Sequence, residues 1–359
     1  MHGFGGRSLR RFWWRRRNFY DEIGPKIIEN ANSSSLPTKM SKRDFDAYAA
    51  TDRAPLCHRR FRLRVCVFPP PSYGGAAVLE ILGLMDRLRP TRSDFLDDDF
   101  VHAFVEAGRV AEVDRMGIAA DTPGDKLNLT LLNATYLDRR ANEIKRSRRL
   151  KDPISPGYRK EPWRSGCQNN RHAPAPSTSH ISITDANDAA LAMTTTINTN
   201  FGSWIDVGGF FLNNALTNFS HSGDPICALA ESSTPETAMA LFVVTEMSGR
   251  PKIIGGAAGG GEIVDYVAQV LIELLHGKSP LAVVDEGHVS TARSPYPSSA
   301  GEVELEAGRG ISELEAALSQ RGHRVRIAPL PSGISVLFRN GNRWAGAADP
   351  RRDGSVSLE

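Results

Sequence analysis

The residues best suited to chemistry lie in a threonine-rich segment, STSHISITDANDAALAMTTTINTNFG, which runs from Ser177 to Gly202. A threonine hydroxyl is a weak nucleophile at its own pKa and needs a base to accept its proton. At a chain terminus the free α-amino group of the threonine can serve as this base, because its pKa is about 8. Thr178 follows a proline-rich stretch at the start of a predicted strand. The segment therefore predicts either a threonine-rich hairpin or a nucleophile released by a cut between Ser177 and Thr178.

A second candidate is the glycine-rich run GGAAGGGE at residues 255–262. Neither a Gly-Lys-Ser/Thr sequence nor a G-x-G-x-x-G pattern accompanies it, which argues against a nucleotide phosphate site. Glycines allow the backbone to approach a ligand closely, so the N–H groups of Gly259 and Gly260 could form an oxyanion hole. A plain tight turn is the alternative interpretation.

Strands and helices that could position these residues alternate in blocks along the chain. Alternating apolar residues predict strands at 63–67, 179–184, 190–198, 240–245, 252–255, 334–339 and 343–347, the last pair joined by the hairpin signal Asn340-Gly341. Apolar residues at helical spacing predict helices near 75–85, 94–111, 131–149, 263–276 and 312–321. Because the strict βαβ period is missing, the pattern favours an α+β fold with two layers of antiparallel sheet flanked by helices.

The composition is that of a soluble globular protein, with 40% hydrophobic and 24% charged residues in 359. No apolar run reaches eighteen residues, so no membrane span is expected. The four cysteines form no C-x-x-C pair and no cluster with metal-ligand spacing, which argues against a zinc site or a disulfide framework. No metal or organic cofactor is expected, and a cytoplasmic location is the default because no signal peptide is recognised.

The N-terminal part of the chain differs in charge from the rest. Residues 1–70 carry 15 Lys/Arg against 6 Asp/Glu, and arginines alternate there with Phe12, Trp13 and Trp14. This pattern has two functional interpretations, contact with nucleic acid or a membrane and a twin-arginine export signal. A disordered or unrelated segment is the favoured interpretation. No nucleic-acid partner is expected.

The order of the motifs resembles that of the γ-glutamyltransferases (γ-glutamyltranspeptidases, glutathione hydrolases), which are N-terminal-nucleophile hydrolases. The segment after the predicted cut matches the family runs Thr-Thr-His-x-Ser-Val-Val-Asp and Thr-x-Asn-x-x-Phe-Gly at Thr178, His180, Ser182, Asp185, Thr196, Asn198, Phe201 and Gly202. Further matching stretches, in the same order as in the family, are PPPSYGG (69–75), FVEAGRVAEVDR (104–115), FLNN (211–214), GAAGG (256–260) and GAADPR (346–351). The resemblance covers about residues 65–359.

This resemblance implies a mechanism and a four-layer αββα sandwich, here incomplete. Self-cleavage after Ser177 would free Thr178 to attack a γ-glutamyl carbonyl and form an acyl-enzyme, which water or an acceptor amine would resolve. Thr196 would hydrogen-bond the nucleophile. Gly259 and Gly260 would form the oxyanion hole. The implied substrate-binding residues are Asn198, Asn218 and Thr237.

The resemblance also implies a division of the chain into parts. Residues 1–65 would be a basic segment unrelated to the family, and residues 66–177 would correspond to the end of the large subunit, finishing in a proline-rich processing loop. Residues 178–359 would correspond to the small, catalytic subunit. The large and small parts would stay associated after cleavage.

Several substrate-binding positions differ from the family pattern. Ala215 and Asn218 stand where the family has Gln and Asp for the substrate ammonium, so an ion pair is lost. A charge-assisted hydrogen bond contributes about 1.5–3 kcal/mol, so γ-glutamyl affinity should fall by about one or two powers of ten. The family's Pro-Leu-Ser-Ser-Met is replaced by PETAM at 235–239, in which Glu236 adds a negative charge and Ala238 lacks a hydroxyl. The upstream arginine that binds the substrate carboxylate has no recognised counterpart.

Three hypotheses follow from the sequence. The chain is an autoprocessing γ-glutamyl hydrolase or transferase acting on glutathione or γ-glutamyl amides. Alternatively, it is an acylase-like amidase for a different acyl group, or a catalytically inactive remnant.

Overall fold

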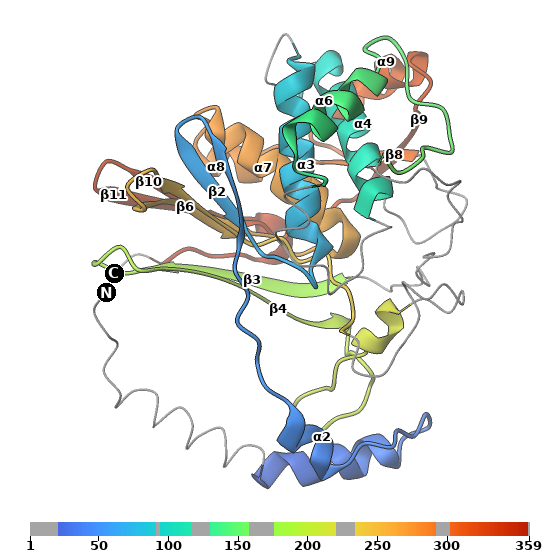
Figure 1. Cartoon of the computed structure of the whole chain (residues 1–359), viewed down its shortest axis with the longest axis vertical. Coiled ribbons are helices and arrows are strands. Elements are labelled where there is room, and N and C mark those ends of the chain that lie inside the picture. Colours follow the sequence, from blue (N-terminus) through green and yellow to red (C-terminus); the bar gives the residue numbers. More distant parts are fainter. Residues whose placement is uncertain are drawn as a thin grey trace. The chain divides into compact units, whose positions relative to one another are not determined.

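The computed structural model describes residues 21–90, 94–115, 130–157, 176–219, 234–291 and 302–357 (Figure 1). The chain divides into two compact units. The larger unit contains Ala54–Thr196 and Leu216–Glu359, and the smaller contains Met1–Arg53 and Ile197–Ala215.

A six-stranded antiparallel sheet forms the centre of the larger unit. Its strand order is β1-β2-β5-β6-β10-β11. The strands are β1 (Leu56–Arg60), β2 (Leu63–Val67), β5 (Phe242–Glu246), β6 (Pro251–Gly256), β10 (Ser335–Asn340) and β11 (Arg343–Ala348). The predicted turn at Asn340-Gly341 joins the last two strands, with Asn340 opposite Arg343. The sheet combines strands from both sides of the predicted cleavage point, since β1 and β2 precede it and the others follow it.

Helices cover one face of this sheet (Figure 1). The helices on this face are α3 (Tyr73–Leu88), α7 (Ile263–Leu275) and α8 (Pro280–Asp285), while α4 (Asp98–Arg115) and α6 (Ala134–Glu143) pack on α3. The helix α3 packs against α4, α6 and α7, and its side chains from Ala76 to Leu82 are nearly all apolar and buried. The rings of Phe100 and Phe104 on α4 each meet Phe95 edge to face with centroids 4.9 Å apart. Apolar burial at this helix–sheet interface is the main source of stability.

The opposite face of the sheet carries a two-stranded hairpin, β3 (Pro176–Thr184) and β4 (Ala190–Thr199). The strand β3 packs on β6 and β10. The described residues of the larger unit thus stack in the order helices, six-stranded sheet and two-stranded sheet. This is the α+β sandwich expected from the sequence, in incomplete form.

The side chains of the hairpin are distributed in an unusual way. Polar and small residues point toward the six-stranded sheet, while Ile181, Ile183, Leu191 and Met193 on the outer face are 42–50% exposed. At the turn of the hairpin, Asp188 pairs with Arg250 at 2.6 Å. The hairpin therefore lies along β6 with its polar face inward.

A three-stranded sheet that the sequence did not predict lies beside α9 (Glu315–Gln320). It contains β7 (Val289–Ser290), β8 (Glu302–Glu306) and β9 (Arg324–Ala328), with β7–β8 antiparallel and β8–β9 parallel. The strand β8 was missed because three of its five residues are glutamates, which are depleted in strands, although Glu304 and Glu306 are buried together with its two apolar residues. Buried carboxylates that find partners only in the folded state hide the apolar pattern of a strand.

Residues 21–60 belong to the segment that the sequence favoured as disordered or unrelated to the family, and they contain helices and a strand. The smaller unit has a helix at residues 21–32, in which Ile27 and Ala31 are buried, and α2 (Lys42–Ala47). In the larger unit, β1 is the edge strand of the main sheet, and among its side chains only Leu56 is buried. Its mostly polar sequence, LCHRR, suits an edge strand and therefore lacks a clear apolar pattern. Residues 1–20 lie outside the described residues.

The structure contains a disulfide bond that the sequence did not lead us to expect. Cys57 on β1 and Cys66 on β2 face each other across the two strands and are bonded. Only the pairing of these strands makes the two cysteines neighbours, so their spacing carried no signal. Cys167 and Cys227 lie outside the described residues. Within the part of the chain that is described, no helix is long and apolar enough to cross a membrane.

We predict that Phe104→Ala lowers the free energy of unfolding by about 3–5 kcal/mol, because it opens a cavity in the fully buried helix layer. Urea denaturation measures this change. Phe61→Ala is the matched control, since Phe61 is 55% exposed and its truncation should cost less than about 1 kcal/mol. Equal effects of the two substitutions would contradict this account of the core.

Candidate active site

The hydroxyl groups of Thr178 and Thr196 meet across the hairpin. Thr178 on β3 donates a hydrogen bond to Thr196 on β4, with 3.1 Å between the two Oγ1 atoms. Both side chains are half-buried and lie on the inward face, which alternates with the exposed face residue by residue. A hydroxyl held in this way has a restricted rotamer, as a nucleophile requires. The side chain of Ser177 lies outside the described part of the chain.

The glycine-rich run forms the loop between β6 and α7. Its backbone adopts φ angles of 137° at Gly259 and 67° at Gly260, which residues with a Cβ rarely adopt. A Cβ on Gly259 would also lie 2.6 Å from the ring of Tyr266. The loop continues into a 3₁₀ turn, η2 (Gly260–Glu262), which β3 contacts, and then into α7. N–H groups at the start of a helix lack partners within the helix, so this loop offers donors beside the strand of Thr178.

Asn218 and Thr237 come together at the start of α3 and help to hold backbone there. Asn218, at the end of the 3₁₀ turn η1 (Ala215–Asn218), donates from Nδ2 to the carbonyl oxygen of Glu236 at 2.8 Å. The hydroxyl of Thr237 accepts from the Met239 N–H at 3.3 Å. The carbonyl oxygen of Thr237 accepts from Ser72 Oγ at 2.9 Å. Asn198, the third predicted substrate residue, belongs to the smaller unit, where its Nδ2 lies 3.5 Å from the carbonyl oxygen of Asn214.

The negative charge of Glu236 lies close to a cation that sequence reasoning missed. One carboxylate oxygen of Glu236 is 3.8 Å from Arg115 Nη1. Arg115 also forms a bidentate pair with Glu112 and stacks on the ring of Tyr73 at 3.7 Å. Burial raises the pKa of the Glu236 carboxyl, and the charge of Arg115 opposes this effect. Arg115 is the last residue of the family-like run at 104–115, but its partner could not be identified before folding.

His180 also lies on the inward face of β3, two residues after Thr178. Its Nδ1 is 2.8 Å from Thr194 Oγ1 and its Nε2 is 3.0 Å from Ser182 Oγ. Burial lowers the pKa of His180 to about 4, so the ring is neutral at neutral pH. No role was predicted for this histidine, although its polar alternation with Thr178 and Ser182 is visible in the sequence.

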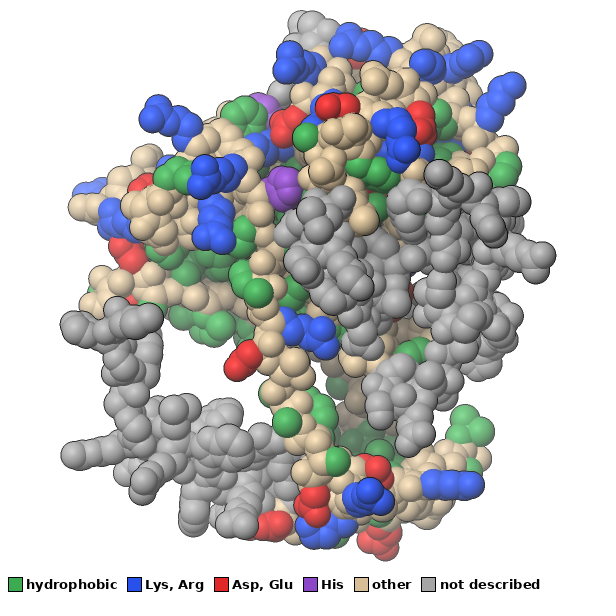
Figure 2. Space-filling view, in the orientation of Figure 1, with side chains coloured by type: hydrophobic (Ala, Val, Ile, Leu, Met, Phe, Trp, Pro, Cys, Tyr) green, Lys and Arg blue, Asp and Glu red, His purple; other side chains and the backbone are tan. Residues whose placement is uncertain are grey.

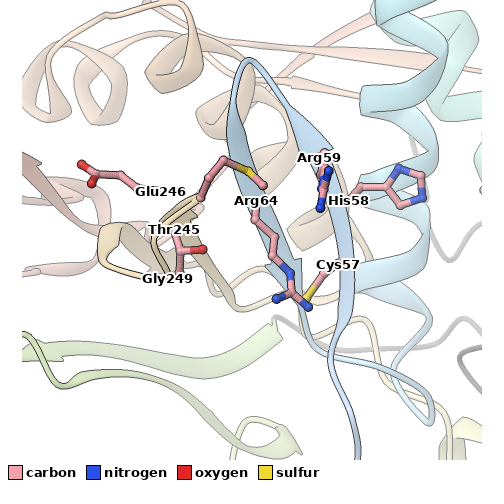
Figure 3. Close-up of a pocket in the computed structure, with 8 residues that line it drawn as sticks. Cys57, His58, Arg59, Arg64, Thr245, Glu246 and Gly249 are labelled. Atoms are coloured by element: carbon pink, nitrogen blue, oxygen red, sulfur yellow. The ribbon is translucent and has the colours of Figure 1, made fainter.

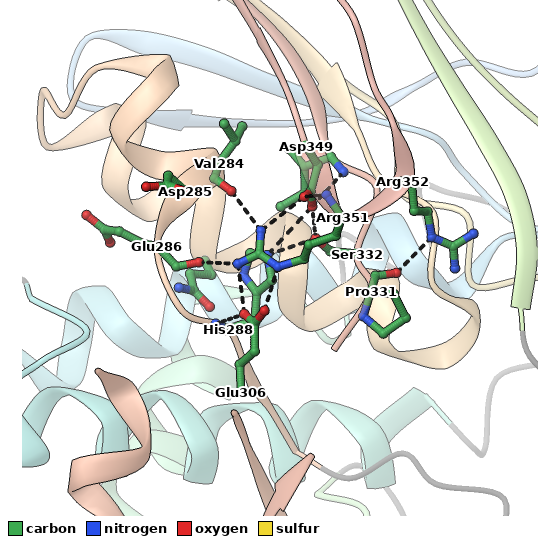
Figure 4. A network of polar contacts seen from close by, with 12 residues as sticks. Val284, Asp285, Glu286, His288, Glu306, Pro331, Ser332, Asp349, Arg351 and Arg352 are labelled. Carbon is green, nitrogen blue, oxygen red and sulfur yellow. Dashed lines mark hydrogen bonds and ion pairs between the residues drawn. The ribbon is translucent and has the colours of Figure 1, made fainter. Parts of the chain in front are cut away.

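A buried polar network lies next to the glycine loop and is drawn in Figure 4. Ala258, within the loop, donates to the carbonyl oxygen of Gly333, next to Ser332. The side chain of Ser332 donates to Asp349, and Arg351 binds both Asp349 at 3.0 Å and Glu306 at 2.6 Å. The GAADPR motif therefore anchors the start of β10 and, through it, the loop.

The network includes a serine, a histidine and an aspartate, but not in a catalytic arrangement. His288 Nε2 lies 2.8 Å from Ser332 Oγ, yet the serine proton is directed to Asp349 and not to the histidine. All three side chains are fully buried, so no substrate can reach the serine. A nucleophile needs its base as the acceptor and an open approach for the substrate.

Two cavities among the described residues lie away from Thr178. A cavity of about 450 Å³ lies at the β5–β6 turn, between Arg59, Arg64, Thr245 and Glu246 (Figure 3). The β5–β6 turn is at the opposite end of β6 from Gly256, against which His180 packs. A second cavity, of about 510 Å³, lies beside Arg60, Asp86 and His276. Neither is lined by a predicted site residue, so the candidate site rests on the hydroxyl and glycine geometry.

The sequence profile of the gamma-glutamyltranspeptidase family matches residues 15–358. The chain belongs to this family. The match begins at residue 15, so most of the N-terminal segment that the sequence analysis set apart from the family lies within it.

Similar curated proteins include both γ-glutamyl and acyl enzymes. The glutathione hydrolase proenzyme of Escherichia coli K12 is 25% identical over 327 residues, which is 87% of this chain and 53% of that protein. The acylase ACY 1 proenzyme of Pseudomonas sp. strain SE83 is 27% identical over 80% of this chain and 48% of that protein. The chain thus spans about half the length of the curated relatives it matches.

Solved structures support the fold. The cephalosporin acylase from Bacillus halodurans superposes with a TM-score of 0.77 at 20% identity, covering 98% of this chain and 61% of that one. At this identity the likeness establishes the fold and not the substrate.

We predict that Asp349→Asn flattens the dependence of stability on pH. Burial alone would raise the pKa of Asp349, but the His288 ring 4.0 Å away, hydrogen bonds from Ser332 and the Arg351 N–H, and the Arg351 charge lower it below its usual value. A lowered carboxyl pKa stabilises the folded state above about pH 4, and this contribution is lost as the pH falls. The substitution should cost about 1.5–3 kcal/mol at pH 7 and less at pH 3 in urea unfolding.

The control for this prediction is Asp353→Asn, at an exposed carboxylate a few residues away. It should leave both the stability and its pH dependence unchanged. A parallel loss at pH 7 and pH 3 for Asp349→Asn would show that the charge of Asp349 is not the stabilising element.

Proposed function

We propose that this chain is an autoprocessing γ-glutamyl hydrolase or transferase with Thr178 as its nucleophile. The single observation that carries the proposal is the hydrogen bond from Thr178 to Thr196, on a strand that contacts the turn following Gly259. Membership of the family and the relatives that are proenzymes support it.

In this proposal, the first reaction is self-cleavage between Ser177 and Thr178: the Thr178 hydroxyl attacks the carbonyl carbon of Ser177, the C–N bond breaks and frees the α-amine, and water hydrolyses the resulting ester. The cut leaves a carboxylate on Ser177 and a free α-amine on Thr178. That amine is close enough to accept the proton of its own hydroxyl, and with a pKa of about 8 it is suited to general-base catalysis near neutral pH.

The second reaction is acyl transfer. The Thr178 oxygen attacks the γ-carbonyl carbon of the substrate, and its proton passes to the α-amine. The N–H groups of Gly259 and Gly260 stabilise the negative oxygen that develops. The C–N bond then breaks, the leaving amine takes the proton, and an ester to Thr178 remains. Water or an acceptor amine attacks this ester and restores the threonine.

The arrangement of the sheet supports continued association of the two parts after the cut. Residues before the cut supply β1, β2 and α3, and residues after it supply the remaining strands of the sheet and α7. The strand β2 pairs with β5, and α3 packs on α7. Separating the parts would expose these buried surfaces to water, at a cost proportional to their apolar area.

An acylase-like amidase is the second candidate, favoured by the substrate-binding positions. Asn218 carries no charge and uses its amide to hold Glu236, and Ala238 lacks a hydroxyl. An acyl group without an α-ammonium suits such a site better than a γ-glutamyl group does. The acylase ACY 1 relatives are consistent with this candidate.

We expect mass spectrometry of the purified chain to show two fragments that separate between Ser177 and Thr178. Thr178→Ala should remain intact and inactive, because the nucleophile is gone. Thr195→Ala, at an exposed threonine on β4, is the matched control and should be processed normally. An intact wild-type chain would favour the inactive alternative, and cleavage of Thr178→Ala at the same bond would disprove the nucleophile assignment.

We further predict that Asn218→Asp shifts the acyl preference. For the γ-glutamyl candidate, kcat/KM for γ-glutamyl anilide relative to glutaryl anilide should rise by about 10-fold or more, because a carboxylate would bind the α-ammonium that glutaryl lacks. Using the ratio cancels damage common to both substrates. A wild type that prefers glutaryl anilide would instead select the acylase candidate.

A further inference from the structure

The ring of His180 joins the two strands of the hairpin on their inward face. Its Nδ1 lies 2.8 Å from the hydroxyl of Thr194 on β4, and its Nε2 lies 3.0 Å from the hydroxyl of Ser182 on β3. The bond to Thr194 is one step along the hairpin from the Thr178–Thr196 bond, two residues further on each strand. The ring therefore fixes the spacing of the strands next to the proposed nucleophile.

The protonation of the ring gives these hydrogen bonds a direction. Because burial lowers the pKa of His180 to about 4, one ring nitrogen carries a proton and the other accepts one at neutral pH. One hydroxyl must therefore donate to the ring and the other must accept from it. Both ring nitrogens are occupied within the hairpin, so His180 is not the base for Thr178.

The same ring fits against the strand that leads to the glycine loop. A Cβ built on Gly256 would lie 2.5 Å from the Cε1 and Nδ1 atoms of His180, so only glycine leaves room for the ring. Gly256 is the last residue of β6, and the chain continues directly through Ala257 and Ala258 to Gly259. A single side chain thus contacts both the hairpin that carries Thr178 and the strand that delivers the proposed oxyanion donors.

We propose that His180 is a positioning residue, which sets the distance between the Thr178 hydroxyl and the N–H groups of Gly259 and Gly260. The inference rests on the proposed function, because it assigns His180 a role in that reaction. His180 touches neither substrate nor the reacting atoms. It acts by bonding Thr194 and by filling the space above Gly256.

The experiment separates the polar role of the ring from its bulk. Thr194→Val keeps the shape of the side chain and removes the hydroxyl that bonds Nδ1. His180→Phe keeps a ring against Gly256 and removes both hydrogen bonds. His180→Asn places an amide near the Nδ1 position and can restore the bond to Thr194. Thr195→Val is the matched control, since Thr195 is the neighbouring exposed residue of the same strand.

The first readout is kinetic, on the anilide that the wild type turns over. Thr194→Val and His180→Phe should each lower kcat at least 10-fold, slow the cleavage after Ser177, and change KM less than threefold. His180→Asn should recover a clear part of the kcat lost in His180→Phe, which a purely space-filling role would not allow. If Thr194→Val and His180→Phe retain the kcat of Thr195→Val, the proposal is overturned.

The second readout is amide hydrogen exchange, which does not depend on activity. Thr194→Val should lose protection both in residues 178–184 and in residues 254–260, whereas Thr195→Val should lose it in neither. Unchanged exchange in Thr194→Val overturns the role of His180 even in an active enzyme. A third outcome separates the two proposals. If the wild type shows neither cleavage nor turnover, the proposed function is refuted. If Thr194→Val nevertheless loses protection in both segments, His180 still links the two segments.

Discussion

The central sheet must be covered on both faces, and this requirement organises the larger unit. Strands β5 and β6 lie in the middle of the sheet, and the buried side chains of Ile253 and Ile254 on β6 belong to consecutive residues that point to opposite faces. The helices α3 and α7 cover one face, and the hairpin of β3 and β4 covers part of the other. The hairpin is therefore held by the sheet, and whatever it carries is held with it.

The composition of that contact is what links the fold to the proposed chemistry. The hairpin presents hydroxyls and one imidazole to the sheet, and its apolar side chains point outward (Figure 2). Buried polar groups are normally hydrogen-bonded to avoid a desolvation cost, and here Thr178 bonds Thr196 across the strands while His180 bonds Thr194 and Ser182. A polar row of this kind is costly as a simple core layer. It is well suited to holding a reactive hydroxyl at a defined place, because each member restricts the rotamer of the next.

Sequence reasoning found the elements with strong local signals and missed those that depend on distant partners. The hairpin at Asn340-Gly341, the helix after the glycine run and the alternation in β3 were all readable, because periodicity and turn residues are local properties. The strand β8 could not be predicted. Glu306 can be buried only because it pairs with Arg351, and Arg351 lies far along the chain. The pair of Glu236 with Arg115 was missed for the same reason, whereas the disulfide of Cys57 and Cys66 was missed because only the pairing of β1 with β2 brings the two cysteines together. The sequence indicated the threonines and glycines of the candidate site. It did not indicate the role of His180, because that role depends on the space that Gly256 leaves in the folded state.

The pairing of β2 with β5 constrains whether folding or the proposed cleavage comes first. Val67 pairs with Phe242, so the middle of the sheet closes only after most of the polypeptide has been made. Closing so long a loop is slow and entropically costly, and a covalent connection between the two halves reduces that cost. Any cut between Ser177 and Thr178 is therefore best made late, on a finished scaffold. Under the proposed function, the uncut polypeptide is the species that folds, and cleavage follows folding.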